Sequence, residues 1–536
     1  MKTDPNEVRF PAPAATPALD TDGVIKFYKL PCRFPDAVLK EAKAIPARVT
    51  WPKDEKRLDL RKKFIFTCDP ETARDYDDAL SLEKNRKSEL VLGVHIADVS
   101  NYVRPGSALD REAYKRSTSV YFCDRVIPML PENLSNGVCS LVPNEDRLAF
   151  SVFMTFDKSG EMVARSFAKS VIRSKARFTY EEVMAILKGG ASKKASRSAC
   201  ATIRAIADLA MTMRARRFKA GALDLEMPEP EVLLDANGEM SSIVTRPYDE
   251  SHQMVEECMV AANEAVAKEL WTRGVKILAR LHDAPDPEKI LLLRSELRGL
   301  GVKMGNIENP KVFAAFLQSI KHHPLYATIS VMILRSMKRA VYDAESMGHF
   351  GLAKKYYAHF TSPIRRYPDL TLHRQLAAYL AANKNPVRAK VPPKTLAKWA
   401  EHTSFCEERA TEAERSLLEI KKYRFLDEQI TSRQILDYDA VVSRVMPFGC
   451  FVEIPTIATS GLVHVSHLSH RYLTFNESDR SLSAPGGESW HVGDRLRVRV
   501  AHVDFRERKI DFVPVRDEKR GARAMSVAKK GKRHRG

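Results

Sequence analysis

Residues 67–79, with the sequence TCDPETARDYDDA, decide the fold and the chemistry that this chain predicts. Four aspartates fall within ten residues of this stretch: Asp69, Asp75, Asp77 and Asp78. Carboxylates this close repel and raise one another's pKa, so such a cluster is stable when a cation lies among them. Oxygen ligands suit Mg²⁺ or Mn²⁺, and these ions can hold the attacking and leaving oxygens of a phosphodiester. The stretch therefore predicts a divalent-metal site with the four aspartates as ligands.

Apolar runs on both sides of the aspartates predict strands. Phe64-Ile65-Phe66 precedes the cluster and residues 90–97 (LVLGVHIA) follow it, so we expect the aspartates on a loop between two buried strands. Apolar residues at helical spacing predict helices over residues 35–45, 254–266 and 392–426. This mixture of strands and helices indicates an α+β domain spanning residues 46–428.

The composition changes near Asp437, where short apolar runs alternate with glycines. Strands are predicted at residues 440–442, 450–452, 461–463, 496–503 and 510–513. Strands that recur at roughly 8–12-residue spacing indicate an all-β barrel, which we assign to residues 436–514. Residues 1–45 are expected to form a partly disordered leader and linker, and residues 515–536 a basic disordered tail.

The charge of the chain indicates a polyanionic partner. The 536 residues include 87 Lys and Arg against 68 Asp and Glu, a net charge of +19, and basic proteins gain affinity for nucleic acids by releasing counterions from phosphates. The eight cysteines are scattered without CxxC spacing, which fits a reducing cytoplasm better than a zinc site or a disulfide framework. There is no apolar run long enough to span a membrane and no signal peptide, so we expect a cytoplasmic monomer.

Three motifs give the sequence a specific resemblance. The aspartate spacing, Asp-x5-Asp-x-Asp-Asp, resembles the signature of the ribonuclease II/R (RNB) family of 3′-to-5′ exoribonucleases. Residues 117–121 (STSVY) with 127–131 (IPMLP), and residues 359–367 (HFTSPIRRY), resemble two further blocks of that family in the same order. The resemblance covers about residues 29–513, and it implies an RNB catalytic domain followed by an OB-fold barrel.

The resemblance implies a Mg²⁺-dependent enzyme, with Mn²⁺ as an alternative, that draws single-stranded RNA by its free 3′ end into a closed channel. Nucleoside 5′-monophosphates would leave one by one. Asp69 and Asp78 would hold the metal, while Asp75 and Asp77 complete the site or orient the attacking water. Arg365 would grip the scissile phosphate, since a guanidinium binds phosphate bidentately and stays charged.

Further residues match RNA-binding positions of the family. Tyr121 matches an aromatic on which the 3′-terminal base stacks, whereas the partner position is occupied here by Leu225, which lacks a ring quadrupole and predicts a looser clamp. Glu414 matches a residue beside the terminal nucleotides, and an ordinary role on a helix surface is equally open. Arg366 either contacts RNA or pairs with Asp369 at i,i+3 spacing.

The C-terminal barrel resembles the ribosomal-protein "S-one" class of OB-fold RNA-binding domains. Residues 444–452 (RVMPFGCFV) and 461–466 (GLVHVS) carry this resemblance. It implies that Phe448, Phe451 and His464 stack on bases and that Arg444, with Arg497, contacts phosphates. The Phe451 ring also fits a place in the barrel core.

Two other functions stay open. A catalytically silent RNA-binding protein would use the barrel without chemistry, and a metal-dependent endonuclease would cut internally or act on DNA. Loss of an aspartate would favour the silent protein, yet all four are present. Only 68 residues precede Asp69, so we expect the N-terminal cold-shock barrels usual in the family to be missing from this chain.

Overall fold

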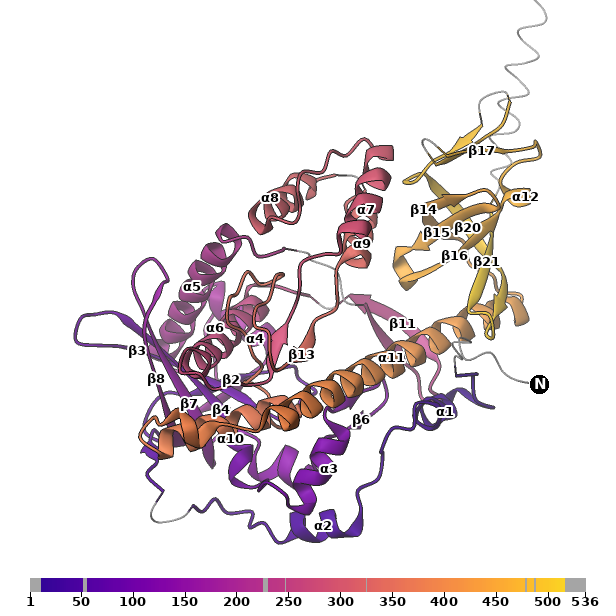
Figure 1. Cartoon of the computed structure of the whole chain (residues 1–536). Coiled ribbons are helices and arrows are strands. Elements are labelled where there is room, and N and C mark those ends of the chain that lie inside the picture. The colour runs from indigo at the N-terminus through magenta and orange to yellow at the C-terminus, as the bar shows by residue number, and fades with distance from the viewer. Residues whose placement is uncertain are drawn as a thin grey trace, which may run out of the picture.

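The computed structural model describes residues 11–51, 55–224, 230–245, 247–323, 325–477, 480–485 and 488–515. Leu225 and the predicted basic tail beyond residue 515 lie outside these ranges. A sheet covered by helices forms one end of the molecule, a barrel forms the other, and the helix α11 (Pro393–Thr431) runs between them (Figure 1). In the described part of the chain, no helix combines the length and the apolar character needed to cross a lipid bilayer.

A seven-stranded mixed sheet is the centre of the larger part, with the strand order β1-β8-β7-β4-β3-β2-β9. The strands are β1 (Leu58–Asp59), β2 (Phe66–Cys68), β3 (Asp78–Lys84), β4 (Leu90–Ala97), β7 (Asp146–Phe156), β8 (Met162–Arg173) and β9 (Ala176–Phe178). The predicted strand at residues 90–97 is confirmed as β4. The predicted position of the loop was wrong in one respect: β3 intervenes, so the aspartates lie between β2 and β3, and Asp78 is the first residue of β3.

Helices cover both faces of this sheet because successive strand residues point to opposite sides. Phe66, Leu80 and Val94 pack on one side against α4 (Tyr180–Leu187), α5 (Arg197–Lys219) and α6 (Glu250–Thr272). Ile65 and Ala79 pack on the other side, against α2 (Asp36–Lys43) and α3 (Ala108–Arg116). The predicted helices at residues 35–45 and 254–266 are confirmed as α2 and α6.

Shorter elements connect the sheet to the rest of the molecule. They are η2 (Val99–Asn101), β5 (Val120–Tyr121), β6 (Val126–Ile127), η3 (Asn133–Val138), β10 (Pro230–Leu234), β11 (Met240–Thr245), β12 (Ala279–Leu281), β13 (Val341–Asp343), α10 (Tyr367–Ala381) and η4 (Pro386–Ala389). The helices α7 (Pro287–Gly299), α8 (Pro310–Ile320) and α9 (Tyr326–Ser336) form a separate unit with its own small apolar core.

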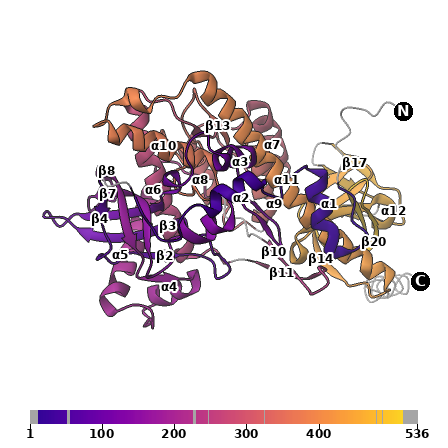
Figure 2. The same cartoon turned by 90° about the horizontal axis from the view of Figure 1, so that it is seen from below.

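Part of the leader that the composition predicted to be disordered is folded. It forms η1 (Pro17–Leu19) and α1 (Asp20–Phe27), which lies beside α11 near the barrel (Figure 2). The Asp20 carboxylate is buried and pairs with Lys421 Nζ at 3.1 Å and Arg424 Nε at 2.8 Å. Composition missed this because the contacts that order the segment come from α11, some 400 positions away.

The C-terminal part is a closed five-stranded barrel with the order β14-β15-β16-β21-β20, which confirms the OB-fold prediction. Its strands are β14 (Tyr438–Met446), β15 (Gly449–Ile454), β16 (Thr459–His464), β20 (Arg495–Asp504) and β21 (Lys509–Pro514). Between β16 and β20 the chain forms α12 (Val465–Leu468) and a small sheet of β17 (Thr474–Asn476), β18 (Ser481–Ser483) and β19 (Ser489–Trp490), with η5 (Pro455–Ile457) earlier. Gly461 is required for closure, since a Cβ there would lie 2.4 Å from the Ile510 carbonyl oxygen.

Candidate active site

The aspartate loop is held at both ends by the sheet. Asp69 directly follows β2, and its N–H donates to the carbonyl of Phe178 in β9 at 3.1 Å. At the other end, the carbonyl of Asp77 accepts the N–H of Ala97 at 2.8 Å, and Asp78 pairs in register with Ile96. The two strand ends therefore fix Asp69 and Asp77–Asp78, while the residues between them span the gap.

Two residues that sequence reasoning missed support the middle of the loop. The Ser140 hydroxyl donates to the Arg74 carbonyl at 2.8 Å and accepts the Tyr76 N–H at 2.9 Å. The Arg177 guanidinium donates to the carbonyls of Pro70 and Glu71. Neither supporting residue carries a local signal, because each acts on a segment more than 60 positions away.

Asp77 connects the loop to the segment 359–367. Its Oδ1 accepts the N–H of Ile364 at 3.0 Å, and its Oδ2 lies 3.9 Å from Arg365 Nε. The Arg365 guanidinium also donates to the Ser362 hydroxyl at 3.1 Å, while 41% of its side chain stays exposed. One buried carboxylate thus aims a solvent-accessible guanidinium across the aspartate cluster.

The motif at residues 117–121 also contacts the segment 359–367 at this site. The Ser119 N–H donates to the Arg365 carbonyl at 3.0 Å, and Thr118 forms an isolated bridge with Arg366. Two residues further on, the Tyr121 hydroxyl lies 3.4 Å from Asp75 Oδ2 and its N–H donates to Glu414 Oε1 at 2.6 Å. The structure therefore brings the three motifs and one residue of α11 together at one site.

Burial makes the carboxylates of this cluster hard to ionise. It raises the pKa of Asp69, and the neighbouring Asp78 carboxylate raises it further. It also raises the pKa of Asp77 and of Asp78, although Arg365 opposes the shift in both. Negative charge here is stabilised by a positive group, which is the environment that a cation supplies.

The donor set fits a divalent cation that keeps part of its water shell. In the described ranges, no three His, Cys, Asp or Glu side chains form a ready-made metal cage. Mg²⁺ does not need one, because it commonly binds through one or two carboxylates plus substrate phosphates. The buried Asp69 Oδ2 has no hydrogen-bond partner, which leaves one hard oxygen available for such an ion.

Arg366 forms the predicted ion pair. Its Nε and Nη2 donate to the two carboxylate oxygens of Asp369 at 2.9 and 2.8 Å. Asp369 is fully buried and also accepts the Ser362 N–H at 2.8 Å. The geometry makes Arg366 a support for the loop that carries Arg365, and its RNA contact stays a prediction.

The segment that leads to Leu225 borders the aspartate loop. Leu223 and Asp224 line a pocket of about 680 Å³ together with Pro70, Glu71 and Thr72. Lys321, directly after α8, has its Nζ 3.1 Å from the Asp224 carboxylate and ties this segment to the end of that helix. The structure thus places the neighbourhood of the predicted second clamp residue at the site, although Leu225 itself is outside the described residues.

The barrel residues that we predicted for RNA binding share one face. Arg444 lies opposite Phe451 in register, and His464 lies opposite Gly449, next to Phe448. The rings of Phe448 and Phe451 meet edge to face at 6.2 Å, and 44% of Phe448 is exposed. Arg497 is different, because its guanidinium pairs with Asp437 at 2.8 Å.

His95, which lies on β4 beside this site, belongs to the core. Its ring nitrogens contact the Ser81 and Ser151 hydroxyls at 2.9 and 2.7 Å, and the side chain is completely buried. Burial lowers the pKa of His95 to about 3, so the ring is neutral at physiological pH.

Comparison with known proteins agrees with this architecture. The family model for the RNB domain matches residues 57–382, and the model for the S1 RNA binding domain matches residues 437–513. Ribonuclease R of Thermotoga maritima is 43% identical over 509 residues, which cover 94% of this chain and 71% of that protein. The structure of Mycoplasma genitalium RNase R in complex with ribose methylated single-stranded RNA superposes with a TM-score of 0.85 at 26% identity, covering 94% of this chain and 78% of the other.

A more distant structure limits what the fold alone can say. Yeast Ssd1, described as a pseudonuclease, superposes with a TM-score of 0.72 at 21% identity and covers 87% of this chain and 58% of its own. One fold therefore accommodates proteins with different activities, and the side chains at the site decide the chemistry.

Proposed function

Since the chain belongs to the RNB family of hydrolytic 3′-to-5′ exoribonucleases, we propose that it degrades single-stranded RNA stepwise from a free 3′ end, in a closed channel, to nucleoside 5′-monophosphates. The observation that carries this proposal is the convergence on Asp77: one carboxylate holds the Ile364 N–H and faces Arg365 across 3.9 Å. All four aspartates and the arginine that the chemistry needs are present. A catalytically silent member of the fold would be expected to lack one of them.

Each residue has a role that follows from its position. Arg365 binds the scissile phosphate through the exposed part of its guanidinium and stabilises the charge that develops there. Tyr121 offers a ring to the terminal base beside the aspartates, and Glu414 fixes the backbone of Tyr121. Asp77 keeps Arg365 oriented through its Oδ2, while its Oδ1 holds the Ile364 N–H.

Asp69 and Asp78 would hold Mg²⁺, with Mn²⁺ as an alternative, and Asp75 and Asp77 would complete the site. Bound there, the ion supplies positive charge to the phosphate oxygens and makes water a stronger nucleophile. Two observations support this assignment. The Asp69 Oδ2 atom has no hydrogen-bond partner, and burial is the largest cause that raises the pKa of Asp69 and of Asp78.

The barrel would hold the RNA that has not yet reached the site. Its exposed Phe448 and Arg444 offer a base platform and a phosphate contact, and the net charge of +19 favours a polyanion. All eight cysteines are free, which fits the reducing cytoplasm that we propose as the location, with the monomer as the working form.

The test uses 5′-labelled RNA and DNA of the same sequence with Mg²⁺, Mn²⁺ or EDTA, and gels that resolve single nucleotides. A ladder that shortens from the 3′ end, from RNA alone and only with metal, supports the proposal. Internal fragments would indicate an endonuclease, cleavage of DNA would remove the RNA selectivity, and intact RNA under all conditions would indicate a silent RNA-binding protein.

A variant pair assigns the activity to the site. Asp77→Asn keeps an oxygen for the Ile364 N–H but removes the charge, so cleavage should fall by at least about 10³-fold while RNA affinity survives. Asp208→Asn makes the same chemical change on an exposed position of α5 and should leave activity unaltered. Equal activity of the two variants would contradict the assignment.

A further inference from the structure

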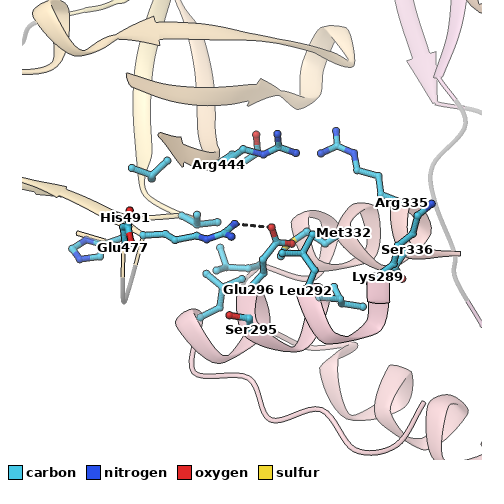
Figure 3. Close-up of a pocket in the computed structure, with 17 residues that line it drawn as sticks. Lys289, Leu292, Ser295, Glu296, Met332, Arg335, Ser336, Arg444, Glu477 and His491 are labelled. Atoms are coloured by element: carbon cyan, nitrogen blue, oxygen red, sulfur yellow. Dashed lines mark hydrogen bonds and ion pairs between the residues drawn. The ribbon is translucent and has the colours of Figure 1, made fainter. Parts of the chain in front are cut away.

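A cavity of about 470 Å³ lies where the barrel faces the α7–α9 unit (Figure 3). Leu292, Glu296 and Arg335 line it from the helices, and Arg444 and His491 line it from the barrel side. Its walls come from two parts of the chain that fold around separate apolar cores. Anything bound here therefore contacts both parts at once.

Two contacts hold these walls together. Arg480, between β17 and β18, pairs with Glu296 of α7 at 2.7 Å. Gly493 lies so close to Leu325 that a Cβ at this glycine would approach the leucine side chain to 2.4 Å. The cavity is thus a feature of a docked interface rather than an open gap.

The charges in the cavity are unbalanced. The lining includes four basic side chains, Lys289, Arg335, Arg444 and Arg480, against the two carboxylates Glu296 and Glu477. Glu296 is already engaged by Arg480. Among the described residues, neither Arg335 nor Arg444 has a carboxylate within ion-pair distance, and Figure 3 shows these two side chains directed toward each other from opposite walls.

Glu453 on β15 is an acidic group on which Arg335 acts electrostatically. Burial raises the pKa of Glu453, and Arg335 opposes that shift. Two facing guanidiniums repel each other, so the arrangement is favourable when an anion lies between them.

A phosphodiester backbone satisfies this requirement. A guanidinium binds phosphate oxygens bidentately, and Leu292 and Met332 add apolar surface in the same cavity for a sugar or a base. The site also continues the aromatic face of the barrel, because Arg444 lies opposite Phe451 in register. An RNA strand that passes Phe448 and Phe451 can therefore contact Arg444 next and then Arg335.

We propose that this cavity is an RNA backbone subsite in which Arg335 of α9 and Arg444 of β14 share a phosphate of the strand on its way to the catalytic site. The inference rests on the proposed function in one respect, that RNA is the polyanion. The same phosphate chemistry could come from a free nucleotide, which the experiment must separate from RNA.

The test measures binding in EDTA, so cleavage does not enter. The Arg335→Gln variant and the unaltered protein are titrated with a labelled RNA of about 25 nucleotides and one of about 5 nucleotides, at several salt concentrations. We expect the variant to bind the long RNA about 5- to 10-fold more weakly near 0.1 M salt, with the slope of log K against log salt reduced by about one. Affinity for the short RNA should not change.

Arg298→Gln is the matched control, because it removes the same charge from an exposed position of α7 outside the cavity lining. An unchanged salt slope in Arg335→Gln, or equal losses in the two variants, would overturn the subsite. Saturable binding of ATP that Arg335→Gln abolishes, with long-RNA affinity intact, would assign the cavity to a free nucleotide instead.

The proposed function can fail separately. If the unaltered protein binds long RNA with the expected salt slope but leaves it intact with Mg²⁺, the exonuclease proposal is wrong and the subsite stands. If RNA is degraded stepwise while Arg335→Gln binds like the control, only the subsite is wrong.

Discussion

Asp369→Asn should damage both the stability and the chemistry of this protein. The Asp369 carboxylate is fully buried and accepts three hydrogen bonds, from Arg366 Nε at 2.9 Å, from Arg366 Nη2 at 2.8 Å and from the Ser362 N–H at 2.8 Å. An asparagine has one oxygen and one NH₂ group. In either orientation, the NH₂ would face a donor, and the Arg366 charge would lose its counter-ion.

The magnitude follows from that geometry. Removing one partner of a buried ion pair costs about 3–5 kcal/mol, and we expect about 3 kcal/mol because 16% of the Arg366 side chain remains exposed. Ser362 and Arg366 flank Ile364 and Arg365, so the loop that aims Arg365 loosens as well. A displacement of about 1 Å at a catalytic group costs about 10²-fold in rate, and we expect this loss mainly in kcat.

Denaturant unfolding and single-turnover cleavage of a short RNA measure the two effects. Asp22→Asn is the control, because it breaks an ion pair with Arg125 whose side chains are 56% and 44% exposed, and such pairs contribute less than about 1 kcal/mol. The double variant Arg366→Met/Asp369→Leu removes both charges and should recover much of the stability but not the rate. A free energy of unfolding for Asp369→Asn within about 0.5 kcal/mol of that of the unaltered protein, together with an equal cleavage rate, would refute this prediction.

Three further outcomes are expected. Tyr121→Ala should weaken capture of every 3′-terminal base alike, by about 1–3 kcal/mol in kcat/KM, while Tyr121→Phe keeps most of it; dependence on one base would argue against stacking. Phe448→Ala should weaken binding of a long RNA by about tenfold without slowing cleavage of a tetranucleotide, and an equal loss for both would place Phe448 outside the proposed platform. Because the pKa of His95 falls to about 3 on folding, the neutral ring makes its full contribution to stability above pH 6.5, and this contribution is lost as the pH is lowered from there toward 3. By pH 5 the loss is about 2 kcal/mol, and His95→Gln should make the melting temperature less dependent on pH between 7.5 and 5.

Local patterns predicted the elements that are held by their own sequence. The apolar run 90–97 became β4 with the same limits, and the five barrel strands appeared where apolar residues alternate with glycines. The strand β3 was missed because it starts at Asp78, whose charge resembles the loop before it, although Ala79, Leu80 and Leu82 continue in a strand pattern. Here the neighbouring strands decide the structure, not the propensity of the segment.

The site was predictable as a set of residues but not as a geometry. The motifs named the four aspartates, Arg365 and Tyr121, and the structure brings them together. No local pattern indicates that the Asp77 side chain would bind the backbone of Ile364, or that Ser140 and Arg177 would support the loop, because these contacts join distant segments.

The 39-residue helix α11 sets the distance and the rotation between the two ends of the enzyme. Glu414 fixes Tyr121 on one of its turns, and Tyr423 and Leu426 belong to the barrel core about 2.5 and about 3.3 turns later. A straight helix advances about 1.5 Å and turns about 100° per residue. One inserted residue between these turns would swing the barrel out of phase with the catalytic end, so the length of this stretch is constrained even where its surface side chains are free to vary.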